Sequence, residues 1–147
     1  KAVKYLEEAI ASEETDALTD ADYYYRLARY CVNTDKGKAY SAAQKAMELD
    51  PSLSGKAYMI MGTIWGSTVC SGNEIERRAP YWVAVDFLVK ARNADPELAE
   101  EANNFIRQYS GYFPKTADAF MYDIIDGQSY TVSCGGLRAT TTVRTQN

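Results

Sequence analysis

The chain of 147 residues contains no histidine. Histidine is the commonest general base, a usual zinc ligand and a member of the usual catalytic triads. A glycine-rich phosphate loop is also missing, because Gly135 and Gly136 lie in a strand-like pattern and no helix follows them. We therefore expect a protein that is not an enzyme, with no cofactor and no metal site.

The sequence also lacks an excess of positive charge and any long apolar run. The net charge is −4 and the isoelectric point is near 4.9. Nucleic-acid phosphates call for a basic face, so we expect no nucleic-acid partner. No apolar run approaches the length of a membrane-spanning helix, so we expect no membrane span in this chain. Hydrophobic residues at 46% and charged residues at 24% are ordinary globular values, and the length fits one domain.

What the sequence does contain is a recurring trio of small residues. Spacings of four and then three residues place each trio on one helical face, where small side chains let a neighbouring helix approach closely. Asp50-Pro51 follows the second trio and Asp95-Pro96 follows the third, and both pairs predict the start of a new helix. The trios are Ala2, Leu6 and Ala9, then Ala39, Ala43 and Ala46, then Ala84, Leu88 and Ala91.

Upstream of the trios stands a second pattern: aromatic, two residues, large apolar, small, two residues, aromatic. Tyr58, Met61, Gly62 and Trp65 fit it without adjustment. Two looser copies are Tyr24, Leu27, Ala28 and Cys31, then Ala102, Phe105, Ile106 and Tyr109. With these two patterns, residues 1–113 resemble the tetratricopeptide repeat (TPR) family.

The resemblance implies an all-α fold, a right-handed solenoid of antiparallel helix pairs. The packing positions it implies are Ala39, Ala43, Ala46, Gly62, Ala84, Leu88 and Ala91.

The chain begins within a truncated repeat, so we expect a fragment of a longer protein. Thr19 and Asp22 predict a helix start. Residues 66–80 are expected to form an inserted surface loop before a helix over 81–93.

After residue 113 the pattern changes, and residues 114–147 are expected to form a C-terminal cap. Residues 117–125 predict a short amphipathic helix with Phe120, Ile124 and Ile125 on its apolar face. Two β-branched runs around Gly135-Gly136 then predict a β-hairpin that packs on the helices and covers the open end of the solenoid. The stretches YFPKTADAF and DGQSYTV also resemble the C-terminal ends of Bacteroidetes TPR proteins. That resemblance implies a periplasmic or cell-envelope location, and it does not indicate any activity.

The three cysteines leave one unpaired in any disulfide scheme. Cys31 takes an inward position of a repeat helix and is expected to be a small buried hydrophobe. Cys70 and Cys134 lie in irregular segments, where they either form a disulfide in an oxidising compartment or remain free thiols in a reducing one.

The TPR resemblance also implies a concave face lined by the first helix of each pair. Its predicted residues are Asp22, Tyr25 and Arg29, then Lys56, Met59 and Thr63, then Glu100, Asn103 and Arg107. We expect a non-enzymatic scaffold that binds a protein or peptide through this face or through the insertion. The alternative is a glycan-binding accessory module of an envelope uptake system, with exposed tyrosines and Trp65 or Trp82 stacking on sugars.

Overall fold

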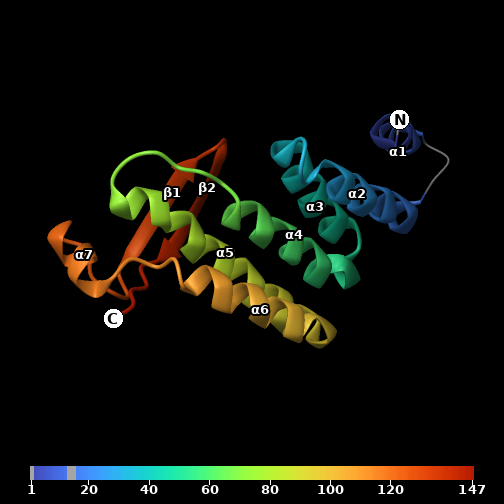
Figure 1. Ribbon diagram of the computed structural model, residues 1–147. Coiled ribbons are helices and arrows are strands. Elements are labelled where there is room, and N and C mark those ends of the chain that lie inside the picture. Colours follow the sequence, from blue (N-terminus) through green and yellow to red (C-terminus); the bar gives the residue numbers. More distant parts are fainter. Residues whose placement is uncertain (1, 13–15) are drawn as a thin grey trace.

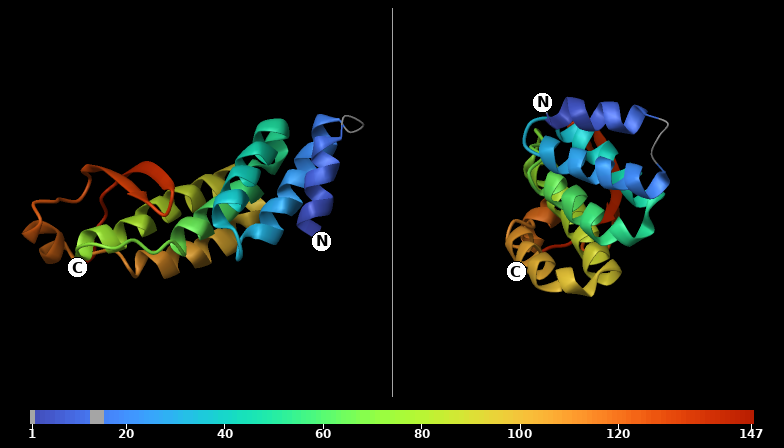
Figure 2. Two further views of the ribbon diagram at one scale, coloured as in Figure 1. Left: turned by 90° about the horizontal axis from the view of Figure 1, so that it is seen from above. Right: turned by 90° about the vertical axis from the view of Figure 1, so that its right-hand side faces the viewer.

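The computed structural model describes residues 2–12 and 16–147, and these form an elongated array of helices with a small hairpin at one end (Figures 1 and 2). Within these residues there are seven α-helices, two short 3-10 helices and one two-stranded antiparallel sheet. The elements are α1 Ala2–Ala11, α2 Ala17–Cys31, α3 Lys36–Leu49, η1 Pro51–Leu53, α4 Ser54–Gly66, α5 Glu74–Ala94, η2 Pro96–Leu98, α6 Ala99–Ser110, α7 Thr116–Met121, β1 Ser129–Cys134 and β2 Leu137–Thr142.

Aspartate side chains mark the helix starts. Asp50 and Asp95 both cap a 3-10 turn that begins with proline, and their backbone angles are nearly the same, with φ −139° and ψ 95° against φ −141° and ψ 96°. The repeated Asp-Pro signal therefore produces the same turn twice. At α2 the capping prediction is wrong: Asp16 rather than Thr19 is the N-cap, and its carboxylate accepts from the Thr19 backbone N–H at 2.8 Å. The predicted connection up to residue 18 includes residues 13–15, which lie outside the described part of the chain.

The helices stack side by side in chain order. Gly55 at the start of α4 faces Ala91 and Asp95 at the end of α5, while Gly62 faces Ala84 and Leu88 further back along α5. These contacts make α4 and α5 antiparallel. Gly55 also approaches Leu98, and Gly66 at the end of α4 approaches Tyr109 near the end of α6, so α4 and α6 run parallel.

Close crossings depend on the small residues that the repeat pattern singled out. All seven predicted packing residues are buried, namely Ala39, Ala43, Ala46, Gly62, Ala84, Leu88 and Ala91. A side chain on Gly62 would place its Cβ 3.1 Å from Leu88 Cγ and 3.2 Å from the Ala84 carbonyl oxygen. The hydrogen at this position lets the α4 and α5 backbones lie in contact.

The segment expected to be an inserted loop is half helix. After α4 ends at Gly66, only residues 67–73 are irregular, and the side chain of Asn73 starts α5 in a capping box with Glu76. The prediction of a loop over 66–80 is therefore wrong for the residues from Glu74 onward. Pro80 lies inside α5 and is buried. The sequence instead predicts it to be in the loop, as the last residue before a helix start.

The C-terminal region forms the predicted hairpin. β1 and β2 pair from Cys134↔Leu137 to Ser129↔Thr142, and the turn residues Gly135 and Gly136 have φ values of +61° and +78°. Such values favour glycine and match the twist of a two-residue hairpin turn. The short helix ends at Met121 rather than residue 125, and the predicted apolar residues Phe120 and Ile125 are exposed while Ile124 is half-buried.

One face of the hairpin packs against α5. Val132 and Tyr130 join the core around Trp82, whose Nε1–H donates to the Arg144 carbonyl at 2.8 Å. Asp86 on α5 accepts from both Thr141 and Arg144. The hairpin thus packs on the helices, as expected, and lies beside α5 (Figure 1).

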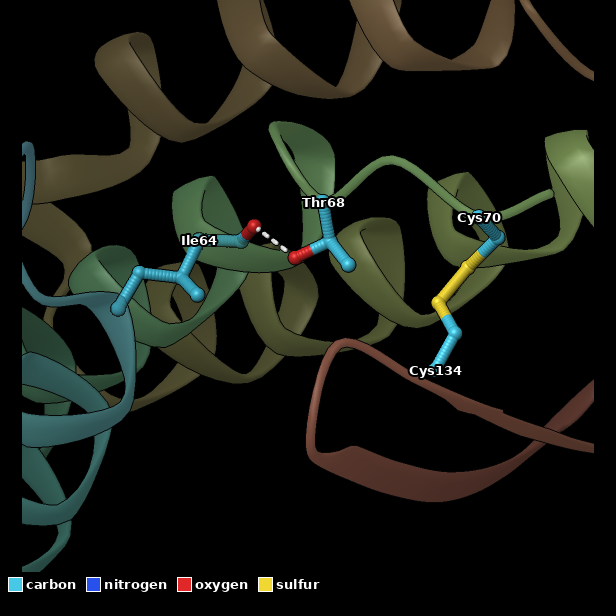
Figure 3. The surroundings of a disulfide bond; sticks show 4 residues. All are labelled: Ile64, Thr68, Cys70 and Cys134. Atoms are coloured by element: carbon cyan, nitrogen blue, oxygen red, sulfur yellow. Dashed lines mark hydrogen bonds between the residues drawn. A yellow bond between two sulfur atoms is a disulfide. The ribbon is translucent and has the colours of Figure 1, made fainter.

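A disulfide joins Cys134 at the hairpin tip to Cys70 in the loop after α4 (Figure 3). The two Cα atoms lie 5.8 Å apart across a sequence separation of 64 residues. Near this loop, the Thr68 hydroxyl donates to the Ile64 carbonyl at 2.7 Å and closes the end of α4 (Figure 3). Cys31 is free and buried, as its inward position predicted.

Candidate binding groove

A groove of about 650 Å³ runs across the face formed by alternate helices α2, α4 and α6. We call it the α2–α4–α6 groove. It exists because α4 is parallel to α6 and because α2 and α4 are also in contact, so these helices stand in a row. The residues that line it are Tyr25, Arg29, Val32 and Asn33 from α2 and its end, Lys56, Met59, Ile60, Thr63 and Ser67 from α4 and its end, and Leu98, Glu101, Phe105 and Tyr109 around α6.

The α2 and α4 walls of the groove contain most of the residues that were predicted from the sequence on these helices. Five of the nine predicted concave residues line the groove: Tyr25, Arg29, Lys56, Met59 and Thr63. The exception on these two helices is Asp22, which does not line the groove and forms an exposed ion pair with Arg26 at 3.0 Å.

On α6 none of the three predicted residues lines the groove. Glu100 is exposed outside the groove, Asn103 accepts a hydrogen bond from Arg92 of α5 at 2.7 Å, and Arg107 donates to Asn104 on its own helix. The residues that do line the groove, Leu98, Glu101, Phe105 and Tyr109, follow helical spacings of three and four. That amphipathic pattern was visible in the sequence, but the weak repeat match with Ala102 in an aromatic position set the wrong register.

Tyr25 is the centre of the groove's charged wall. The Arg29 guanidinium carbon and the Lys56 ammonium nitrogen each lie 5.8 Å from the centre of the Tyr25 ring. Both distances are within the range of a cation–π interaction. Neither cation belongs to an ion pair within residues 2–12 and 16–147, so both charges remain available to a ligand.

The opposite wall and the floor are mainly apolar. Phe105 and Tyr109 are stacked, with ring centres 5.8 Å apart, and Met59 of α4, which is 8% exposed, also lines the groove. Burial raises the pKa of the Tyr109 hydroxyl, and the nearby Tyr81 raises it further, so the phenol is neutral at neutral pH. Glu101 is the one acidic side chain among the lining residues, and it is exposed.

The site therefore combines two unpaired cations on one wall with aromatic and thioether surface on the other. Aromatic and Met side chains supply contact area, while Arg binds carboxylates through two parallel hydrogen bonds. No group of three or more potential metal ligands occurs in the part of the chain that the structure describes. No helix among those residues is both long enough and apolar enough to cross a bilayer.

Both tryptophans lie in the core instead of on a surface. Trp65 and Trp82 are each fully buried, and Trp65 Nε1–H donates to the Tyr40 hydroxyl at 3.2 Å. The three consecutive tyrosines Tyr23, Tyr24 and Tyr25 are all half-buried.

Comparisons of this chain with protein-family models, with curated proteins and with solved structures find no match.

Proposed function

We propose that the chain is a TPR-like solenoid that acts as a non-enzymatic interaction module and binds an extended peptide in the α2–α4–α6 groove. The observation that carries this proposal is Tyr25 with Arg29 and Lys56 beside it, on an open face made by alternate helices. Antiparallel pairing of α4 with α5, together with buried small residues at their crossing, supports the repeat architecture.

The chemistry of the two walls defines the peptide. Arg29 and Lys56 attract a carboxylate, and the surface of Met59, Phe105 and Tyr109 accepts an apolar side chain next to it. The preferred ligand is therefore a segment that carries an acidic residue beside a large apolar one.

The glycan-binding alternative has lost its two tryptophans. Stacking on a sugar ring needs an exposed aromatic face, and both tryptophans are fully buried, while the exposed tyrosines Tyr5, Tyr30, Tyr112 and Tyr122 do not line the α2–α4–α6 groove. We therefore propose peptide binding alone. The cell-envelope location is part of the same proposal, and the disulfide between Cys70 and Cys134 supports it because such bonds persist in oxidising compartments.

The test is selection from a displayed library of random peptides, followed by calorimetric titration of the selected sequences. We expect enrichment of acidic residues next to large apolar residues. Lys56→Glu and Arg29→Glu should each weaken binding about tenfold, because each places a like charge against the ligand carboxylate. Lys45→Glu is the matched control, since Lys45 is an exposed lysine on α3 that does not line the groove. Equal affinity of the selected peptides for Lys56→Glu and the unmodified protein would contradict the proposal.

A further inference from the structure

The hairpin has two outer edges that differ in what lies beside them. Within the described residues, β1 and β2 pair only with each other. Val143 N–H donates to the Gln128 carbonyl at 2.8 Å, and hydrogen-bonded pairs alternate along an antiparallel ladder. The pairs Thr131↔Thr140 and Ser129↔Thr142 are therefore non-hydrogen-bonded pairs. Their backbone N–H and C=O groups point away from the partner strand.

The edge of β1 is confined by the segment after α4. Cys134 at its end is joined to Cys70, and the hollow along this edge measures about 170 Å³. Ser71 and Glu76 line that hollow together with β1. Little room is left there for another strand.

The edge of β2 opens onto a larger groove of about 590 Å³ between β2 and α5. We call it the β2 groove. Its α5 side carries Val83, Asp86, Phe87, Val89 and Lys90. Its strand side carries Ser129 of β1, residues 139–142 of β2, and Arg144. Unpaired backbone groups therefore lie next to an apolar helix surface, the arrangement that an added strand requires.

The charge around this edge is positive. Lys90 Nζ lies 5.2 Å from the centre of the Phe87 ring and has no carboxylate partner among the described residues, and the same holds for Arg138 on β2. Arg144 is paired with Asp86. Antiparallel pairing of β2 with a second copy would bring Arg138 of each chain towards Arg144 of the other, which like-charge repulsion disfavours.

We infer that the open edge of β2 binds an extended acidic segment of another protein by strand addition. The backbone of that segment pairs with the outward N–H and C=O groups of Thr140 and Thr142. Its alternate side chains are apolar where they face Val83 and Phe87 on α5. Its carboxylates lie on the opposite side of the strand, with Arg138, and Lys90 on α5 adds positive charge at the same edge. This site is separate from the α2–α4–α6 groove and does not depend on it.

The probe is an acetylated, amidated peptide in which valine alternates with glutamate. A twin peptide with N-methyl groups on alternate backbone amides keeps every side chain but cannot pair along an edge. With nitrogen-labelled protein, the first peptide should shift the backbone amide signals of Thr140 and Thr142 and slow their hydrogen exchange. The N-methylated twin should do neither.

Two proline variants form a matched pair. Thr140→Pro removes an outward N–H from the β2 edge without removing a hydrogen bond to β1, and Thr131→Pro removes the equivalent N–H from the β1 edge. Thr140→Pro should weaken peptide binding about fivefold or more, while Thr131→Pro should change it less than about twofold. Lys90→Glu should weaken binding of the glutamate peptide and strengthen that of a valine–lysine peptide, which tests the charge without touching the strand.

Circular dichroism melts check that each variant is folded. If proline disrupts the hairpin, the N-methylated peptide and Lys90→Glu still decide the question. Three results would each overturn the inference. They are equal binding of the N-methylated and unmethylated peptides, amide shifts confined to the α2–α4–α6 groove, and self-association of the protein through β2. The groove proposal is tested separately by the variants Lys56→Glu and Arg29→Glu, which lie outside the β2 groove, so the two proposals fail separately.

Discussion

Replacement of Gly62 by leucine tests the helix crossing on which the array depends. Gly62 lies in the middle of α4, and a Cβ there would stand 3.1 Å from Leu88 Cγ and 3.2 Å from the Ala84 carbonyl oxygen. Leu88 and Ala84 are both 0% exposed, so neither can move into solvent. The three further carbons of a leucine side chain therefore force the two helices apart.

The size of the effect follows from two opposing terms. Overpacking a close-packed core costs about 1 to 3 kcal/mol, and the larger value applies where a backbone carbonyl is among the neighbours. Leucine gains about 0.7 kcal/mol over glycine in helix propensity. We expect a net loss of about 2 kcal/mol in the free energy of unfolding, which lowers the melting temperature by about 4 to 8 °C in a chain of this length. Gly62→Ala should be nearly neutral, because its smaller steric cost is offset by a similar gain in propensity.

Denaturant unfolding followed by circular dichroism measures the loss, with Gly37→Leu as the matched control. Gly37 is exposed near the start of α3, and the nearest atom to its added Cβ is the Asp35 carboxylate oxygen at 3.8 Å. The control should stay within about 0.5 kcal/mol of the unmodified protein. If Gly62→Leu unfolds at the same midpoint and with the same slope as the unmodified protein, the α4 and α5 backbones are not in contact.

Three further results are expected. The Cys70→Ser, Cys134→Ser double variant should lose about 4 kcal/mol of stability, since the disulfide closes a loop across a separation of 64 residues, and a mass shift on reduction and alkylation counts the bond. Arg144→Met should cost about 1 to 2 kcal/mol in denaturant unfolding, because its carboxylate partner on α5 is about one-quarter exposed and loses its counterion. The pKa of Glu74 lies below its ordinary value because of its hydrogen bond to Arg78, so the charged form of Glu74 stabilises the folded state above about pH 4.5. When the melting temperature is measured at decreasing pH, this contribution should be lost as the pH falls through the lowered pKa of the folded state.

Local signals in the sequence predicted the elements whose cause is itself local. The Asp-Pro pairs specify capped turns by side-chain chemistry at the turn, and the Gly-Gly pair specifies the hairpin through its positive φ values. The start of α5 also carries a local signal, the capping box of Asn73 and Glu76, but the prediction followed Pro80 instead. A proline normally marks a first helical turn, yet Pro80 lies inside the helix and is fully buried, so tertiary packing overrides its local preference.

The groove shows the same division. Its α2 and α4 walls were predicted because their packing positions fit the repeat pattern and fixed which side chains face outward. The α6 wall was missed because the rotation of a helix about its own axis is set by what it packs against. Tyr109 packs against Gly66, and Asn103 accepts a hydrogen bond from Arg92, and these two contacts distinguish the groove-lining pattern of α6 from the repeat register that Ala102 suggested.

The hairpin and the α2–α4–α6 groove differ in what holds them in place. A two-stranded hairpin is only marginally stable by itself, so the position of the β2 edge depends on what holds the hairpin. Three attachments hold it: its apolar face packs on α5, Asp86 contacts Thr141 and Arg144, and the disulfide ties down its tip. The groove needs none of these, since its walls are helices whose contacts are with one another. Reduction of the disulfide should therefore weaken strand addition at β2 and leave peptide binding in the groove unchanged, which makes the redox state of one bond a means of separating the two surfaces.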